Sequence, residues 1–104
     1  MYDITALGEV LIDFTAAGIS PAGQRLFEQN PGGAPANVLA VMSRYGSKTS
    51  FIGKVGNDMH GLFLKQTLED LGIDCQGLIM DAQVFTTLAF VDLDASGERT
   101  FSFA

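Results

Sequence analysis

Six consecutive residues, Gly32 to Asn37, have the types and the spacing to bind a small polar molecule, and their sequence is Gly-Gly-Ala-Pro-Ala-Asn. Two adjacent glycines let the backbone bend and approach a ligand without a Cβ in the way. Pro35 suits the first turn of a helix, where Asn37 would carry a donor and acceptors beside free backbone N–H groups. The run predicts either a ligand-binding loop or a Gly-rich turn that only begins a buried helix.

Asp13 is the second residue that indicates binding. It follows the aliphatic run Val10-Leu11-Ile12, which is typical of a buried strand, and it precedes Phe14. Open α/β sheets bind ligands beyond the carboxyl ends of their strands. Asp13 is therefore predicted either to accept hydrogen bonds at the mouth of a cleft or simply to face water.

Residues suited to catalysis or metal binding are scarce. His60 is the only histidine, lies in a predicted first helical turn and is expected to be a surface residue. Cys75 is the only cysteine, so the chain has no internal disulfide, and no cluster has metal-ligand spacing. Lys54 follows a glycine, but Val55 stands where a phosphate-binding loop needs Ser or Thr. We identify no catalytic residue and no metal ligand in this chain.

The composition describes a globular chain with few charges. Of the 104 residues, 47% are hydrophobic and 17% are charged, and the formal net charge is −6. This balance argues against a nucleic-acid partner, because nothing in the chain could neutralise a row of phosphates. No apolar run reaches membrane-spanning length and the N-terminus is unlike a signal peptide, so we expect no membrane partner and a cytoplasmic protein.

Two helices are predicted from apolar residues spaced by three and four. The first begins after the double glycine and ends before Gly46. The second runs from about Met59 to Leu71, with Asn57 or Asp58 as its cap and Gly72 after its end. Their apolar stripes are Val38, Val41, Met42 and Tyr45 in the first helix, and Leu64, Leu68 and Leu71 in the second.

Short apolar runs predict strands at 4–7, at 49–52 and, from a weaker signal, at 73–80. These strands alternate with the two helices. The order β-α-β-α-β is typical of a parallel sheet flanked by helices.

Two further segments indicate a second, smaller sheet. Residues 16–23 are predicted as a loop and 25–29 as an exposed strand. Together they indicate an excursion of the chain away from the main sheet. Residues 86–93 and 99–103 alternate around turn chemistry and predict an antiparallel hairpin. We expect the hairpin to pair with the earlier excursion.

The predicted parallel sheet has too little cover. Such a sheet needs both faces covered, and two helices cannot do this for all these strands. The chain also stops at Ala104, within an alternating strand. We therefore expect the N-terminal part of a longer protein, and the alternative is a small domain covered by a partner subunit.

The segments Gly8–Phe14, Gly32–Val38 and Phe51–Asp58, in this order, resemble the N-terminal landmarks of the ribokinase-like (PfkB) carbohydrate kinases. Together with 86–91 and 97–101, the Gly-Gly-Ala-Pro-Ala-Asn form is most similar to bacterial fructokinases. One residue departs from the family pattern. Leu39 stands where the family has a small residue, and we expect this to adjust packing rather than remove function.

The resemblance implies an α/β fold, a Rossmann-like α/β/α sandwich with a small β-sheet lid over the sugar, incomplete in this chain. Residues 1–104 would form the N-terminal part of one sugar-kinase domain, with lid segments at about 10–30 and 86–103.

The resemblance also implies roles for particular residues. Carried over by position, Asp13 would accept hydrogen bonds from sugar hydroxyls, and Asn37 would bond another hydroxyl. Gly32 and Gly33 would let the backbone meet the sugar. The lid would offer contacts from Phe27, Arg99, Phe101 and Phe103.

The implied activity is transfer of the ATP γ-phosphate to a primary hydroxyl of fructose or a related sugar. In the family the general base and most contacts to ATP and Mg²⁺ lie nearer the C-terminus, so we expect this chain alone to be inactive. The alternatives are a kinase for ribose, a keto-deoxy sugar acid or a nucleoside, and a non-catalytic sugar-binding or oligomerisation module. Unpaired strands at the lid edge also indicate a homodimer through the lid.

Overall fold

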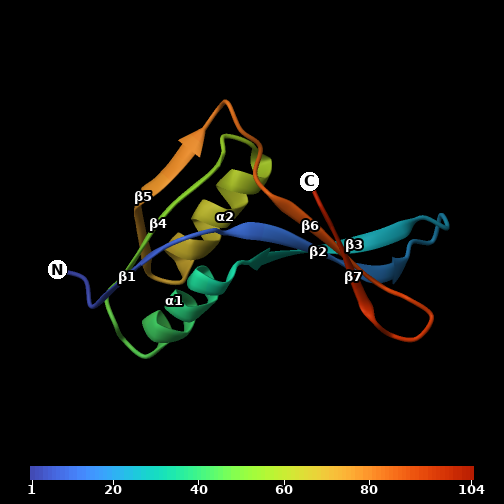
Figure 1. The fold of residues 1–104 in the computed structure, drawn as a ribbon, viewed down its shortest axis with the longest axis horizontal. Helices are drawn as coiled ribbons and strands as arrows, with labels where there is room; N and C mark the ends of the chain where they lie inside the picture. The colour runs from blue at the N-terminus through green and yellow to red at the C-terminus, as the bar shows by residue number, and fades with distance from the viewer.

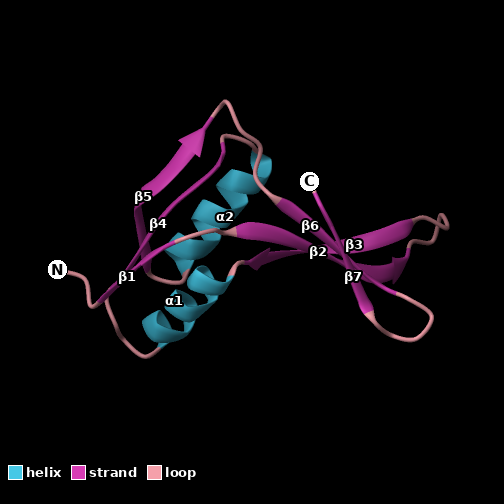
Figure 2. Ribbon diagram, viewed as in Figure 1, coloured by secondary structure: helices cyan, strands magenta, loops and turns pink.

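The computed structural model describes residues 1–104 and shows two β-sheets side by side in a molecule of 50 × 32 × 23 Å (Figure 1). The first sheet carries both helices, and the second projects away from them (Figure 2). The chain enters the second sheet twice, after β1 and again after β5.

The first sheet has three parallel strands in the order β1-β4-β5. This arrangement confirms the parallel sheet predicted from the alternation of strands and helices. Its elements are β1 (Ile4–Leu7), α1 (Ala34–Arg44), β4 (Thr49–Gly56), α2 (Met59–Asp70) and β5 (Ile73–Asp81).

Both helices pack on one face of this sheet. Phe51 and Val55 of β4 and Leu78 of β5 are buried there, against Leu39 of α1 and Leu64 of α2. The opposite face is bare in this chain. Leu7, Ile52 and Ile79 point to that side and are exposed.

The second sheet has four strands in the order β3-β2-β6-β7. Its two halves are antiparallel pairs, β2 with β3 and β6 with β7, and they meet in the parallel pairing of β2 with β6. The prediction that the excursion and the hairpin form a second sheet is confirmed. The strands are β2 (Leu11–Ile19), β3 (Arg25–Gly32), β6 (Leu88–Leu93) and β7 (Arg99–Phe103).

The strand predicted at 86–93 begins only at Leu88, and three other predicted boundaries fall short of the observed strands. The loop predicted at 16–23 is short, because β2 continues to Ile19. β3 extends beyond the predicted end to Gly32, and β4 continues through Gly53 to Gly56. In these three strands, pairing with a neighbouring strand satisfies the backbone N–H and C=O groups. Residues of low strand propensity, such as glycine, are therefore included in the strand.

The helices occur where they were predicted. Asp58 caps α2 by accepting a hydrogen bond from the Gly61 N–H at 2.7 Å. Gly46, with a φ of +91°, follows the end of α1. Leu64 and Leu68 are buried as predicted, whereas Leu71 at the C-cap remains 39% exposed.

The apolar stripe predicted for α1 is not its packing face. Val38, Val41 and Tyr45 are 57%, 52% and 81% exposed. The helix contacts the core instead through Ala36 and Leu39, which are buried. Periodicity finds an apolar face, but the direction in which the chain enters the helix decides which face meets the sheet. Leu39, the departure from the family pattern, fills the core.

Candidate functional site

One face of the second sheet collects side chains from all four strands, and those from β2, β3 and β7 include polar groups. Asp13 of β2 lies opposite Asn30 of β3 and beside Ala89 of β6. Because side chains alternate between faces, Thr15 shares this side, which we call the Asp13 face. The Asp13 face contains a hollow of about 360 Å³, lined by Asp13, Thr15, Ala16, Asn30, Val91, Leu93, Arg99 and Phe101.

The charged groups of the hollow have no partners in the chain. The half-buried carboxylate of Asp13 forms no hydrogen bond or ion pair, and neither does the guanidinium of Arg99. Asn30 and Thr15 are joined by a bond of 3.0 Å from Asn30 Nδ2 to Thr15 Oγ1. An unpaired acceptor and an unpaired donor on the wall of one hollow are suited to a ligand rich in hydroxyls.

The double glycine leaves room for this arrangement. A Cβ atom on Gly32 would overlap the Asp13 carboxylate, so any larger residue there would displace it. Gly33 has a φ of +113°, and a Cβ there would overlap the carbonyl oxygen of Glu9. These glycines bring the backbone from the Asp13 face directly into α1.

Asn37 does not line the hollow. It is exposed on α1, its backbone N–H is already bonded to the Gly33 carbonyl, and its side chain has no partner within the chain. The structure therefore places it next to the double glycine but outside the Asp13 face.

The lid residues named from the sequence lie on different faces. Arg99 and Phe101 line the hollow, and the ring of Phe103 stacks on that of Phe101 with centroids 6.3 Å apart. Phe27 lies on the opposite face, where its ring meets that of Phe90 at 6.0 Å. Strand register, which alternation alone does not supply, separates the two groups.

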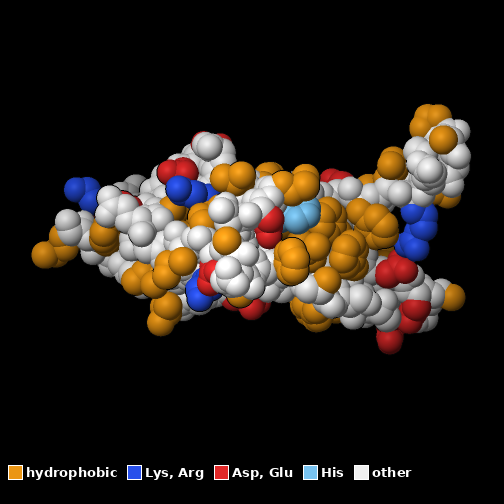
Figure 3. Space-filling view, turned by 90° about the horizontal axis from the view of Figure 1, so that it is seen from above, with side chains coloured by type: hydrophobic (Ala, Val, Ile, Leu, Met, Phe, Trp, Pro, Cys, Tyr) orange, Lys and Arg blue, Asp and Glu red, His pale blue; other side chains and the backbone are white.

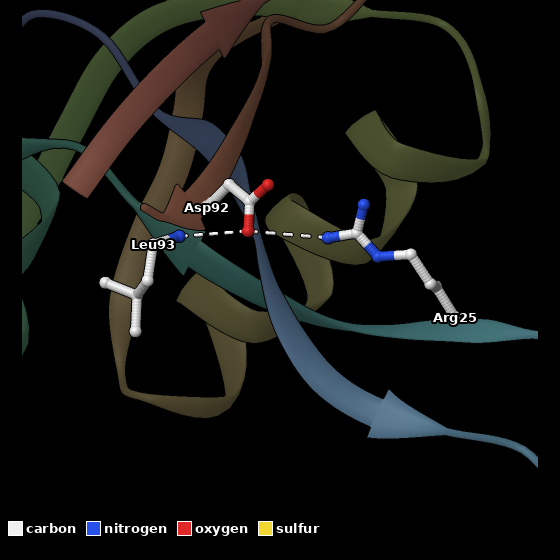
Figure 4. Close-up of polar contacts among 3 residues, drawn as sticks. All are labelled: Arg25, Asp92 and Leu93. Atoms are coloured by element: carbon white, nitrogen blue, oxygen red, sulfur yellow. Dashed lines mark hydrogen bonds and ion pairs between the residues drawn. The ribbon is translucent and has the colours of Figure 1, made fainter. Parts of the chain in front are cut away.

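The opposite face, called the Phe14 face, is aromatic. Phe14 stacks on Phe90 with centroids 5.1 Å apart, and Phe27 completes the cluster. At the end of this face Arg25 lies over the Phe27 ring. Its guanidinium pairs with Asp92 at 3.4 Å (Figure 4). Both partners are exposed, so this ion pair adds little to stability.

The prediction that His60 is a surface residue is wrong. Its ring is half-buried, meets the edge of Phe14 at 5.6 Å and is bonded through Nδ1 to Gln29 Nε2 at 3.0 Å. Figure 3 shows the histidine, in pale blue, bordered by hydrophobic side chains. Its partners come from β2 and β3, which are remote in sequence, so no local pattern revealed them.

Sequence reasoning missed five residues of the hollow, namely Thr15, Ala16, Asn30, Val91 and Leu93. Thr15 could have been predicted, because it is two residues after Asp13 on the same strand and therefore lies on the same face. Asn30 and Val91 required the pairing of β2 with β3 and with β6.

The segment around Lys54 does not form a phosphate-binding loop. The Gly53–Gly56 segment is an extended strand whose backbone is paired with β5, so it cannot wrap around a phosphate. Nowhere do three metal-ligating side chains come together. Neither helix is long and apolar enough to cross a membrane.

Comparison with known proteins gives consistent matches. The model of the pfkB family carbohydrate kinases matches residues 1–104. Fructokinase-1 of Oryza sativa subsp. japonica is 47% identical over 102 residues, which cover 96% of this chain and 32% of the rice protein.

Solved structures agree. The crystal structure of fructokinase from Xylella fastidiosa has a TM-score of 0.89 at 42% identity, over 96% of this chain and 31% of that one. The structure of the same enzyme with bound ATP has a TM-score of 0.86 at 43% identity, over 96% of this chain and 29% of that one. The chain spans about a third of the length of these relatives. The likeness confirms the predicted ribokinase-like α/β fold.

Proposed function

Because this chain belongs to the pfkB family of carbohydrate kinases, we propose that the complete protein transfers the ATP γ-phosphate to a primary hydroxyl of fructose or a related sugar. The proposal for fructose is supported by the fructokinases of rice and Xylella fastidiosa. The use of ATP is supported by the ATP-bound form of the second enzyme. Mg²⁺ would accompany ATP and neutralise part of the phosphate charge.

The observation that carries the proposal is the unpaired Asp13 carboxylate in the hollow. A carboxylate can accept from two hydroxyls at once, and each charge-assisted bond contributes roughly 1.5–3 kcal/mol. Arg99 adds donors and the Asn30 amide oxygen adds an acceptor, because its nitrogen already donates to Thr15 and Glu28. The Phe101 ring offers an apolar surface to the C–H side of a sugar. We assign Asn37 a hydroxyl contact from the α1 side, since its amide is free and adjoins Gly33.

In this proposal the chain contributes recognition and the rest of the protein contributes chemistry. The second sheet, which projects beside the first, acts as the lid over the sugar. The general base and the nucleotide site lie in the remaining two-thirds of the protein, so residues 1–104 alone are expected to be inactive.

The test is a phosphorylation assay of the full-length protein with fructose, ribose, a keto-deoxy sugar acid and a nucleoside. The proposal predicts that fructose has the highest kcat/KM. A higher kcat/KM for one of the other three compounds would change the proposed substrate but would still support a kinase. Sugar binding measured by calorimetry without turnover of any compound would favour the non-catalytic module and overturn the proposal.

We also propose that the complete protein forms a homodimer through the Phe14 face. Phe27 and Phe90 remain 39% and 37% exposed there, and the ion pair between Arg25 and Asp92 leaves the end of this face without net charge. Such a surface is self-complementary about a two-fold axis. Sedimentation should show a dimer that Phe27→Ser weakens, whereas Phe85→Ser, at an exposed position in a connecting loop, should not. A monomeric wild type would refute this assembly.

A further inference from the structure

The segment that leads into β6 is held by a cluster of hydrogen bonds at the start of α2. Asp58 Oδ1 accepts from the Thr86 hydroxyl at 2.8 Å, and Oδ2 accepts from the Thr86 N–H at 3.0 Å. The Thr86 Oγ1 in turn accepts from the Gly56 N–H at 3.0 Å. We call this set the Asp58–Thr86 clamp. It joins the end of β4, the first turn of α2 and the start of the second sheet.

The clamp is closely packed. Thr86 is only 3% exposed. A Cβ on Gly56 would overlap the Asp58 carboxylate, and a Cβ on Gly61 would overlap the Gly56 carbonyl oxygen. Little space is therefore left for the segment at Thr86 to shift while the clamp is closed.

The clamp exceeds what a helix cap requires. Capping of α2 needs only the bond from the Gly61 N–H to Asp58. The two bonds from Thr86 add nothing to that cap, and they tie a residue 28 positions later in the chain. Their effect is on the segment that contains Thr86.

That segment reaches the hollow within a few residues. The Thr87 carbonyl accepts from the Ile12 N–H at 3.1 Å, and β6 then pairs Ala89 with Asp13. One wall of the hollow comes from β2 and β3 and the other from β6 and β7. The pairing of β2 with β6 joins the two walls. The place where Thr86 is held therefore sets where Val91 and Arg99 stand relative to Asp13.

We propose that Asp58 and Thr86 are positioning residues that fix the spacing of the two walls, although neither lines the hollow. What the hollow binds rests on the proposed function, but the mechanical link between clamp and sheet does not. The inference gives a role to Gly56 and Asp58 of the Phe51–Asp58 motif, which sugar contact leaves unexplained.

The experiment compares three variants of the full-length protein. Thr86→Val removes the hydroxyl and keeps the shape, Thr86→Ser keeps the hydroxyl, and Thr67→Val makes the same change where the hydroxyl bonds only within α2. We expect Thr86→Val to raise the KM for fructose at least about fivefold, with the KM for ATP within about twofold. Thr86→Ser and Thr67→Val should stay within about twofold of wild type in both constants.

A merely structural role would lower the amount of active enzyme and leave the fructose KM unchanged, and that result would overturn the inference. So would an equal rise in fructose KM in Thr67→Val. If Thr86→Val does not fold, Asp58→Asn replaces it. The amide oxygen of Asn can still accept from the Gly61 N–H, whereas its NH₂ group would face the Thr86 N–H and could not accept from it.

Hydrogen exchange separates this inference from the proposed function. In Thr86→Val, amides of Ile12 and of β6 should exchange at least about tenfold faster, while those that pair β1 with β4 stay unchanged. This readout needs no sugar, so it holds even if the wild type phosphorylates none of the compounds tested. Unchanged exchange in β6 would overturn the inference.

Discussion

The carboxylate of Asp13 fills the space that a Cβ atom on Gly32 would occupy. The two residues lie on adjacent strands, β3 and β2, and on the same face of the second sheet. The glycine thus leaves room for an acceptor that has no partner within the chain. This relationship links the two features that first indicated binding in the sequence.

Gly32→Ala should therefore impair sugar use through Asp13. The alanine methyl group has to displace the carboxylate, and the backbone at Gly32 has a φ that alanine can adopt. We expect kcat/KM for fructose in the full-length protein to fall at least about tenfold. Steady-state kinetics with fructose varied would measure it. Wild-type kinetics in this variant would show that the position of Asp13 is irrelevant to the sugar.

Asp13→Asn should weaken sugar use directly. Charge-assisted bonds become neutral ones, so we expect kcat/KM for fructose to fall at least about tenfold. The matched control is Asp92→Asn on the Phe14 face, where the lost ion pair is exposed and kcat/KM should stay within about twofold. An unchanged value for Asp13→Asn would remove this residue from the site.

Asp58 should make stability fall in acid. Burial alone would raise the pKa of its carboxyl, but hydrogen bonds from Thr86 and Gly61 outweigh this and hold the pKa below its usual value. A carboxyl whose pKa is lower in the folded state contributes stability that is complete above the unfolded-state value of about 4. That stability is lost as the pH falls through the folded-state pKa.

Asp58→Ala should therefore cost about 2 kcal/mol near neutral pH, and the difference from wild type should shrink below about pH 4. Urea denaturation of the full-length protein at several pH values would measure both effects. Asp70→Ala, at the other end of α2, serves as control and should change stability by less than about 0.5 kcal/mol. A pH-independent difference would contradict the hydrogen-bond explanation.

Cys75 should be chemically inert in the folded protein. Its side chain is 8% exposed, and burial, with Glu69 and Asp74 nearby, raises the pKa of its thiol to about 11. Since only the thiolate reacts, alkylation at about pH 7.5 should be on the order of 100-fold slower than in the unfolded chain. Peptide mass mapping after iodoacetamide treatment in buffer and in concentrated urea would show this. Equal rates would mean that β5 opens readily.

Elements with local signals are predictable from the sequence. Asp58 and Gly46 mark helix ends because capping and a positive φ depend on the residue and its near neighbours. The order of strands and helices likewise predicted the parallel sheet, and the change of pattern predicted a second one. Residue type and position also single out Asp13 and Gly32, although their contact depends on strand pairing.

Which of these residues meet depends on how distant segments of the chain pack together. Val38 and Leu39 are both apolar, and only the packed helix shows that the first is exposed and the second buried. Phe27 and Phe101 fall on opposite faces, and His60 joins Gln29, because of strand register and the placement of α2. Register depends on pairing between distant segments, so no window of sequence contains it. The hollow beside Asp13 exists only once four strands from two parts of the chain are aligned.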